Sequence, residues 1–515
     1  MPVVTLHQRL RELDAARLRG MQRGIEKEGL RVQPDGSLAR TPHPAGLGSA
    51  LTHPHITTDF SESQLELVTG VHARVEDCLH ELETIHRVVL QSLGDECMWA
   101  ASMPGQLPPD ADIPIGYYGS SNVGQAKRVY RLGLSHRYGS RMQTISGIHY
   151  NWSFPGATSE DYFALIRNFR RHSFLLLRLF GASPAVTSAF AAGQPHGLDA
   201  MSAHTLYLPY ATSLRMGRLG YQSDAQSALC VSYNDLEGYA DSLHEALTVP
   251  YPPYEAIGIH DPAGGYRQLA TSLLQIENEF YSTIRPKRVI RSGERPLHAL
   301  RERGVEYVEV RCMDVNPFLD VGIDAHTARV LDVFLLQAML SSSPPDSPDE
   351  VRALQSNLLL AASRGREPGL QLIREGQPIS LADWGLALLD EGVAVAEAMD
   401  AACGGHAYAT SWARAREDFL AVEQLPSARV LAAIQDQYAG RFDAFALDRS
   451  GLVKQSLCGV SLTDDQQAVW RQMADVSVAE QARIESEDVL PFELFRQAYI
   501  DPQGLTVAAS SSTTA

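Results

Sequence analysis

The sequence predicts an α+β protein, because strand-like and helix-like patterns are distributed unevenly along its 515 residues. Before Ser341, short segments with the two-residue alternation of β-strands are interspersed with helical patterns. After Ser341, amphipathic helical patterns dominate, as over residues 381–402. We therefore expect a sheet-bearing body over residues 1–340 and a mostly helical cover over residues 350–505, packed on the same body. Residues 506–515, rich in Ser and Thr, are predicted to form a disordered tail.

Composition and charge exclude several classes of protein. Lys and Arg number 44 against 61 Asp and Glu, which gives a net charge of −17. Such a surface repels nucleic acids and anionic membranes, and no basic stripe in the sequence counters it. The longest apolar runs, 173–182 and 330–340, are about half the length of a membrane span. We therefore expect no nucleic-acid or membrane partner, and any positive charge used for an acidic ligand must be concentrated locally.

Cysteine usage indicates a reducing compartment. Six cysteines are scattered without a Cys-x-x-Cys pair, which in so long a chain is not typical of a disulfide framework or a zinc knuckle. The N-terminal residues also lack the apolar segment of a signal peptide. We therefore predict free thiols and a cytoplasmic location.

The first unusual feature is a pair of carboxylates in the strand-like segment 24–32. Glu26 and Glu28 lie two residues apart, so on a strand they point the same way, about 7 Å apart. Two like charges on one face repel each other. Either this is an edge strand that faces water, which is the favoured interpretation from this segment alone, or a cation lies between the carboxylates.

Two more strand-like segments carry polar side chains on one face. Glu309 and Arg311 share a face opposite valines, and this pair is either a surface ion pair, worth under about 1 kcal/mol, or a metal ligand beside a phosphate-binding guanidinium. His149 and Asn151 share a face opposite apolar residues. A lone histidine of this kind is more often a hydrogen-bonded structural residue than a ligand.

A fourth segment, 57–70, has an ambiguous period. Asp59 and Glu62 have the spacing of a helix N-cap box, whereas the residues around Glu66 alternate as a strand does. If the capping interpretation holds, Asp59 and Glu62 are structural and only Glu66 needs another explanation.

Together, these four segments favour a site for hard cations. Mg²⁺ binds carboxylate oxygens and keeps open positions for phosphate oxygens. The sequence contains no glycine-rich phosphate loop, no dinucleotide-binding glycine motif, no His-Glu-x-x-His and no Gly-x-Ser-x-Gly. A dehydrogenase, a serine hydrolase and a metallopeptidase are therefore disfavoured. The candidate ligands are Glu26, Glu28, Asp59, Glu66, His149 and Glu309.

A basic and aromatic set remains, in segments 126–134, 211–221 and 274–294. The third segment concentrates four cations within seven residues of an acidic protein, and its proline indicates a turn or a strand entry. The run is either solvated or bound to a phosphate or a substrate carboxylate. The four cations are Arg285, Lys287, Arg288 and Arg291.

These segments resemble the bacterial glutamate–cysteine ligase (γ-glutamylcysteine synthetase) family, of the γ-proteobacterial type. The matching strings run in order from about residue 20 to residue 330, and beyond Ser341 the resemblance fades. They are RGIEKEGLRV, GSALTHPHITTDFSESQLELVT, YGSSNVGQAKRVYRLGLSHRYGSRMQTISGIHYNWS, YLPYATSLRMGRLGY, LQIENEFYSTIRPKR and GVEYVEVRCMDVNPF.

The resemblance implies a glutamine-synthetase-like fold, in which a curved, mainly antiparallel sheet forms an active-site funnel covered by helices. It also implies ligation of the glutamate γ-carboxyl to the cysteine amine through γ-glutamyl phosphate, the first step of glutathione biosynthesis. ATP would be the co-substrate, Mg²⁺ (with Mn²⁺ as an alternative) the cofactor, and glutathione a feedback inhibitor. The rivals are a ligase of the same fold that uses another amine, and a non-enzymatic binding protein.

Roles for individual residues follow from the same resemblance. The six candidate ligands above resemble the family's metal-site residues, with Glu309 also catalytic, and Arg311 resembles its phosphoryl-contacting arginine. Asn151 is expected to bind substrate, and nucleotide phosphates are assigned to Arg285, Lys287 and Arg288. Residues resembling the cysteine-side pocket are Phe60, Tyr130, Leu134, Gln143, Arg215, Tyr221 and Tyr281.

Overall fold

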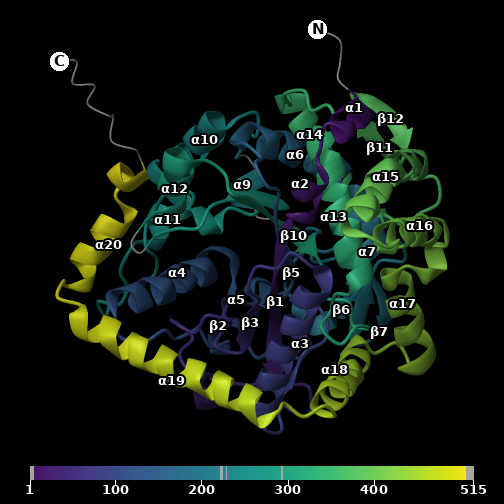
Figure 1. The fold of residues 1–515 in the computed structure, drawn as a ribbon. Helices are drawn as coiled ribbons and strands as arrows, with labels where there is room; N and C mark the ends of the chain where they lie inside the picture. Colours follow the sequence, from purple (N-terminus) through teal and green to yellow (C-terminus); the bar gives the residue numbers. More distant parts are fainter. Residues whose placement is uncertain (1–4, 221–223, 228, 292–293, 506–515) are drawn as a thin grey trace, which may run out of the picture.

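The structure is a computed structural model that describes residues 5–220, 224–227, 229–291 and 294–505. Within these residues, an antiparallel sheet of seven strands lies at the centre of the molecule (Figure 1). Its order is β2, β3, β1, β5, β10, β9, and β4 pairs with the end of β1. The strands are β1 (Gln22–Val32), β2 (Ile56–Thr58), β3 (Gln64–Val68), β4 (Cys97–Met98), β5 (Ile148–Ser153), β9 (Ile284–Lys287) and β10 (Tyr307–Met313).

The α+β class and the mainly antiparallel sheet are confirmed, and the four segments singled out for polar faces all contribute strands. The position of β1 differs from the favoured interpretation, however. This strand lies inside the sheet, paired with β3 on one side and β5 on the other. Glu28 is only 6% exposed there. The edge-strand interpretation of Glu26 and Glu28 is therefore wrong, and water alone does not explain the two carboxylates.

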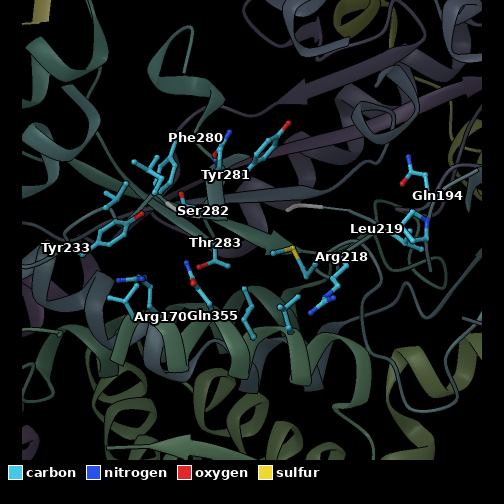
Figure 2. Close-up of a pocket in the computed structure, with 18 of the residues that line it drawn as sticks. Arg170, Gln194, Arg218, Leu219, Tyr233, Phe280, Tyr281, Ser282, Thr283 and Gln355 are labelled. Carbon is cyan, nitrogen blue, oxygen red and sulfur yellow. The ribbon is translucent and has the colours of Figure 1, made fainter. Parts of the chain in front are cut away.

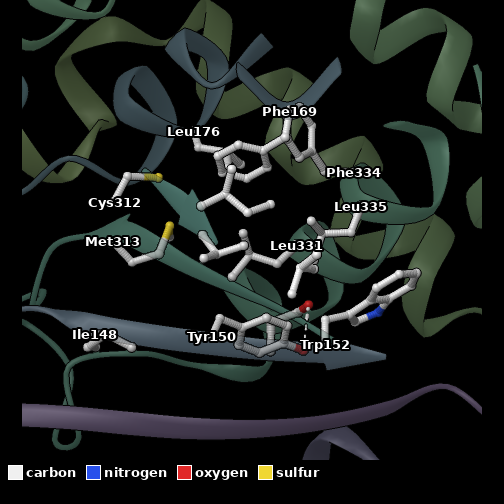
Figure 3. Close-up of a cluster of buried hydrophobic side chains, with 14 of the residues drawn as sticks. Ile148, Tyr150, Trp152, Phe169, Leu176, Cys312, Met313, Leu331, Phe334 and Leu335 are labelled. Atoms are coloured by element: carbon white, nitrogen blue, oxygen red, sulfur yellow. Dashed lines mark hydrogen bonds between the residues drawn. The ribbon is translucent and has the colours of Figure 1, made fainter. Parts of the chain in front are cut away.

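One face of the sheet packs into the main hydrophobic core. Tyr150 and Trp152 of β5 are completely buried, and they face the helices formed by residues 159–172 and 325–340 (Figure 3). Leu331 lies next to them in the same core, and Phe334 packs against Phe169 of the first helix, with ring centroids 5.7 Å apart. Each fully buried side chain of this size contributes about 1.5–3 kcal/mol relative to exposure. This packing forces the intervening polar residues of the strands onto the opposite face, because the side-chain period of a strand is two.

A buried ion pair joins this core face to the helices. Nη2 of Arg23, on β1, lies 3.2 Å from Oδ2 of Asp332, and both side chains are almost completely buried. Tyr150 donates a hydrogen bond of 2.8 Å to the same carboxylate, and Tyr408 donates one of 3.3 Å. Strands β1 and β5 are thus attached to two helices by one shared carboxylate.

Helices surround the sheet on both sides (Figure 1). The helix α4 begins after Ser121, whose hydroxyl accepts a hydrogen bond from the N–H of Gly124. The helices of the first two thirds are α1 (Leu6–Arg11), α2 (Ala15–Arg19), α3 (Val75–Ser92), α4 (Asn122–Tyr138), α5 (Ser140–Gln143), α6 (Ser159–His172), α7 (Phe174–Phe180), α8 (Ser188–Ala191), α9 (Asp224–Ser227), α10 (Leu236–Thr248), α11 (Pro252–Ile257), α12 (Pro296–Arg303) and α13 (Ala325–Leu340).

The chain after residue 340 is mostly helical. It contains the hairpin β11 (Gln371–Arg374) and β12 (Gln377–Ser380), and its α-helices are α14 (Pro348–Arg364), α15 (Leu381–Cys403), α16 (Ala407–Leu420), α17 (Pro426–Gln437), α18 (Phe442–Cys458), α19 (Asp464–Glu487) and α20 (Phe492–Ile500). A further small sheet has the order β6 (Ala185–Thr187), β8 (Thr205–Tyr207), β7 (Asp199–Ser202). The boundary between body and cover stays a prediction, and the predicted tail over 506–515 lies outside the described residues.

The last two helices wrap around the outside of the molecule. In Figure 1, α19 runs from α18 along the periphery, and α20 continues it to the side on which α4 lies. Ser477 of α19 accepts a hydrogen bond of 2.9 Å from the N–H of Ser49, and Glu485 accepts one of 2.8 Å from Ser120. The helix α20 packs against α4. Among the described residues, no helix combines the length and apolarity needed to cross a membrane.

Candidate active site

The strand register brings the acidic residues onto one face of the sheet. Glu28 of β1 pairs with Glu66 of β3, and Glu26 pairs with His149 of β5. On the other edge of β5, Asn151 pairs with Glu309 of β10. Directly opposed residues of an antiparallel pair point to the same side of the sheet. Four segments that are far apart in the sequence therefore present their polar side chains together.

The tightest part of this cluster contains Glu26, His149 and Glu309. One ligand atom from each of these residues lies within 4.8 Å of the other two. Nδ1 of His149 is 3.0 Å from Oε2 of Glu26 and 3.6 Å from Oε1 of Glu309. Asn151 donates a hydrogen bond of 2.9 Å to the other oxygen of Glu26. Nε2 of His149 is 3.6 Å from Oε1 of Glu28, so the imidazole lies amid three carboxylates.

A cavity of about 790 Å³ opens over this face. Its lining includes every one of the six predicted metal ligands, and it also includes Arg285, Lys287 and Arg311. Asn151 lies beside the cavity through its contact with Glu26 but is not among the lining residues. The described residues predicted for the cysteine side line the same cavity: Phe60, Tyr130, Leu134, Gln143, Arg215 and Tyr281. Tyr221 lies outside the described residues.

The carboxylates experience opposite electrostatic environments. Burial raises the pKa of Glu66 well above its usual value of 4.5, and the negative charge of Glu26 adds to the effect. Burial acts on Glu309 in the same direction, but the cations Lys287 and Arg311 outweigh it, so the pKa of Glu309 lies well below its usual range. At the end of the cluster near β3, burial and the neighbouring carboxylates therefore outweigh the positive charge of Arg131, whereas at the end near β10 the cations outweigh burial.

The cations beside Glu309 come from two neighbouring strands. Nη1 of Arg311 is 3.0 Å from Oε1 of Glu309, and Nζ of Lys287 is 3.3 Å from its other oxygen. Arg285 pairs with Glu309 in the register of β9 and β10, and it donates to the carbonyl of Asn278 at 3.0 Å. The predicted strand entry at this run is correct: Pro286 lies in the edge strand β9, where the sheet tolerates a missing N–H.

Arg288 is the exception among the predicted phosphate contacts. It is not among the cavity-lining residues. Its guanidinium donates to the carbonyls of Arg303 and Gly304, the latter at 3.1 Å, at the end of α12. The structure therefore directs this side chain to a helix terminus, while Arg285 and Lys287 face the cavity.

The described residues predicted for the cysteine side come from α4, from α5 and from three loops, including the loop before β9, and they line the same cavity. Nε2 of Gln143 donates a hydrogen bond of 2.7 Å to the hydroxyl of Tyr281. Arg215 is 2% exposed, and its Nη2 donates to the carbonyl of Arg311 at 2.9 Å. This contact holds the guanidinium next to the strand that carries Glu309. The arrangement offers hydroxyl, amide and guanidinium groups beside the apolar side chain of Leu134.

The capping interpretation of Asp59 and Glu62 is wrong, because no helix begins there among the described residues. The strand interpretation is correct, since Glu66 lies in β3. Glu62 is nevertheless structural: its carboxylate accepts hydrogen bonds from the N–H groups of His43 (2.9 Å) and Tyr117 (2.7 Å). Asp59 points to the cavity instead.

Sequence reasoning missed two groups of lining residues. Lys127 and Arg131 lie one helical turn apart on the stripe of α4 that also carries Tyr130, and this spacing was the available signal. Burial and the neighbouring Arg131 lower the pKa of Lys127 to about 8. The second group, which includes Phe495 and Tyr499, comes from α20. No pattern in the sequence indicates that this distant helix reaches the site.

A second cavity, of about 730 Å³, shares Tyr281 with the first (Figure 2). Arg170, Tyr233 and Gln355 line it, together with Thr283. Its lining contains no Asp or Glu among the described residues. It therefore does not offer the ligands that a hard cation requires.

The donor set of the first cavity fits a hard divalent cation. Five carboxylates and one imidazole converge, and carboxylate oxygens are the ligands that Mg²⁺ and Mn²⁺ prefer. Within the described part of the chain, the buried Nε2 of His149 has no hydrogen-bond partner. An unpaired buried polar atom is costly unless something binds it. The fold and the site place the chain among α+β enzymes whose antiparallel sheet carries an acidic face suited to metal ions and phosphorylated substrates.

Comparisons with known proteins identify the family. A model of the family described as Glutamate-cysteine ligase matches residues 7–360. The glutamate–cysteine ligase of Pseudomonas entomophila is 48% identical over 494 residues, which cover 92% of this chain and 93% of the relative. That of Bordetella parapertussis is 48% identical over 494 residues, covering 93% of each chain. The crystal structure of the Francisella tularensis glutamate–cysteine ligase in complex with AMP has a TM-score of 0.89 and 37% identity, covering 93% of this chain and 97% of that one. The chain belongs to the glutamate–cysteine ligase family.

Proposed function

We propose that the protein joins the γ-carboxyl of L-glutamate to the amino group of L-cysteine, with conversion of ATP to ADP and phosphate. This is the first step of glutathione biosynthesis. One observation carries the proposal: the strand register gathers Glu26, His149 and Glu309 in a single cavity, with Arg311 and Lys287 at its cationic end. The AMP bound to the Francisella relative supports a nucleotide as co-substrate.

The first chemical step would form γ-glutamyl phosphate. A γ-carboxylate oxygen of glutamate attacks the γ-phosphorus of ATP, the bond to the β,γ-bridging oxygen breaks, and ADP leaves with that electron pair. Two anions must approach each other, so positioning and charge neutralisation supply most of the catalysis. Arg311 and Lys287 would stabilise the transferring phosphoryl group, while Glu309 holds both cations in place through contacts of 3.0 and 3.3 Å.

The residues that would hold Mg²⁺ or Mn²⁺ are Glu26, Glu28, Asp59, Glu66, His149 and Glu309. When bound, such ions neutralise phosphate charge and orient phosphate oxygens for in-line displacement. In keeping with this role, the carboxylate-rich face occurs in a chain without a glycine-rich phosphate loop. A glutamine-synthetase-like funnel, with substrates meeting on the polar face of the sheet, is part of the same proposal.

In the second step, the cysteine amine attacks the acyl carbon of γ-glutamyl phosphate and displaces phosphate, and the nitrogen loses a proton. Tyr281, Gln143 and Arg215 would hold the cysteine carboxylate, and apolar neighbours such as Leu134 would accept the thiol-bearing side chain. A different amine remains the second candidate, because pocket changes of methylene size alter preference by only about 1–3 kcal/mol. Glutathione inhibition stays a prediction from the family resemblance, and a cytoplasmic location stays a prediction from the cysteine usage and the N-terminal residues.

The test is ADP release by the purified protein with Mg·ATP and glutamate, with and without cysteine, across a panel of other amines. We expect release that requires both glutamate and cysteine, with γ-glutamylcysteine detected by mass spectrometry. Faster turnover with another amine would preserve the phosphoryl chemistry and reject the cysteine assignment. No turnover with any amine would reject the ligase proposal in favour of a binding protein.

A further inference from the structure

The C-terminal helix α20 forms one wall of the cavity. Phe495, Ala498 and Tyr499 of this helix are among the lining residues. They lie more than 100 residues beyond residue 360, where the match to the family model ends. The site is therefore completed by a part of the chain that the family pattern does not describe.

The wall contributed by α20 is aromatic. The rings of Phe495 and Tyr499 are 5.8 Å apart and inclined by only 12°, and Phe492 continues the row at 6.5 Å from Phe495. Phe495 and Tyr499 are only partly buried. Ala126 of α4 and Ile276 line the cavity beside them. One end of an otherwise highly charged cavity is thus apolar and lined by nearly parallel rings.

Several contacts fix this wall in place. Arg295 donates from Nη1 to the carbonyl of Tyr499 at 2.6 Å, and its guanidinium is itself held by Glu277 at 2.6 Å. Tyr266 donates to the carboxylate of Glu493 at 2.9 Å. The helix is therefore attached both to the loop before α12 and to the loop before β9. These contacts make α20 a fixed part of the cavity wall.

The apolar end extends beyond the residues assigned to cysteine, and Tyr130 lies between the two. The stripe of α4 that lines the cavity runs from Val123 to Leu134, which corresponds to about 16 Å along a helix. Ala126 packs in one hydrophobic cluster with Phe495 and Tyr499, whereas Leu134 packs in another with Phe60, and Tyr130 lies against both clusters. The carboxylate cluster and its cations on the sheet line the same cavity as this stripe. A ligand can therefore lie with an apolar group against α20 and an anionic group over the sheet.

Among the three proposed substrates, only ATP carries a large flat apolar group. Glutamate and cysteine are small and charged, and neither would use an aromatic wall. A purine stacks favourably on aromatic side chains, whatever its hydrogen-bonding pattern. We propose that Phe495 and Tyr499 of α20 bind the adenine ring of ATP, so that the C-terminal helix positions the nucleotide whose phosphates reach Arg285, Lys287 and Arg311. This inference rests on the proposed function.

The experiment compares two probes by isothermal titration calorimetry on the full-length protein: Mg·ADP and Mg·pyrophosphate. Replacing Phe495 by Ala should weaken ADP binding about tenfold, because base stacking of this kind is lost on alanine substitution, and pyrophosphate binding should change less than about twofold. The matched control is Leu494→Ala, which alters the neighbouring residue on the outer side of α20, where it is 53% exposed. It should leave both affinities unchanged.

The outcomes separate the inference from the proposed function. If the wild-type protein releases ADP in the ligation assay and the Phe495→Ala affinity for ADP is unchanged, the adenine assignment is overturned and the ligase proposal stands. Equal loss of ADP and pyrophosphate affinity would also overturn it, since the wall would then be merely structural. Should Phe495→Ala unfold, Tyr499→Leu keeps the apolar bulk without the ring, and it must show the same selective loss of ADP affinity. Absence of ADP binding and turnover in the wild type would reject both proposals.

Discussion

Glu26 of β1 and His149 of β5 face each other across the sheet, with Oε2 of the carboxylate 3.0 Å from Nδ1 of the imidazole. The pairing explains why a histidine is placed on a strand among acids. A carboxylate that contacts one imidazole nitrogen orients the ring, so the other nitrogen faces a defined direction. Here Nε2 is directed towards Glu28 at 3.6 Å. Glu26 therefore fixes the orientation of the imidazole on the acidic face, with Nε2 on the side of Glu28.

Removing the charge of Glu309 should stop turnover while leaving the fold intact. Glu309→Gln keeps the shape of the side chain but removes the anion that holds Arg311 and Lys287. We expect kcat to fall at least about 100-fold, because preorganised charges of this kind contribute several kcal/mol in an enclosed site. ADP release measures kcat, and thermal melting monitors folding. The matched control is Glu306→Gln, since Glu306 is exposed and outside the cavity. Near-normal turnover of Glu309→Gln would contradict the proposed metal and phosphoryl site.

The cysteine-side pocket should respond selectively to loss of one hydroxyl. Tyr281→Phe removes the group that accepts the 2.7 Å hydrogen bond from Gln143. The variant also lacks the hydroxyl that would bind the cysteine carboxylate. Loss of that hydrogen bond, worth about 1 kcal/mol, should raise the KM for cysteine about fivefold, with the KM for glutamate nearly unchanged. Steady-state kinetics with each substrate varied in turn measures both values. Tyr210→Phe, at an exposed tyrosine, is the control. An equal rise in both KM values would contradict the assignment of Tyr281 to the cysteine-binding pocket.

Divalent cations should stabilise the protein, and the effect should depend on Glu66. The folded-state pKa of Glu66 is raised above its usual value of 4.5, so the folded state binds more protons there than the unfolded state. Without metal, its contribution to the free energy of unfolding therefore falls as pH rises above 4.5, until pH passes the raised folded pKa. Saturating Mg²⁺ should reverse this loss, adding about 2.7 kcal/mol at 100 times its Kd.

Thermal melting at several pH values, with Mg²⁺ or with EDTA, measures both effects. Glu66→Gln should raise the melting temperature in EDTA, because it removes a buried charge that is repelled by Glu26. The same variant should show a smaller increase on adding Mg²⁺. A Mg²⁺-dependent increase equal to that of the wild type would indicate that Glu66 does not contribute to a metal site.

The buried ion pair between Arg23 and Asp332, on the apolar face of the sheet, should contribute strongly to the free energy of unfolding. Asp332→Asn would leave the guanidinium of Arg23 buried without its counter-charge, which costs about 3–5 kcal/mol. Chemical denaturation measures this loss. Asp390→Asn, which breaks an exposed pair with Arg416 at 2.8 Å, should cost at most about 1 kcal/mol. Similar costs for the two variants would show that the buried network contributes little.

The sequence by itself determined which side chains share a face of each strand. A two-residue period is a local property, so Glu26 with Glu28, Glu309 with Arg311, and His149 with Asn151 were grouped before any pairing was known. The four polar segments together then indicated six candidate ligands, the family resemblance assigned them to its metal site, and all of them line one cavity. Their roles as ligands stay predictions that the experiments above address.

Only the tertiary structure decided which strands are neighbours and which distant elements reach the site. Local alternation does not distinguish an edge strand from an interior one, because strand pairing depends on residues far away in the chain. For this reason the prediction that β1 is an edge strand is wrong. The cap-like spacing of Asp59 and Glu62 was likewise overruled by pairing of β3 with β1. The helix α20 is amphipathic, and amphipathicity shows that a face is buried without showing against what. Its position beside α4 follows from long-range packing, which no local pattern encodes.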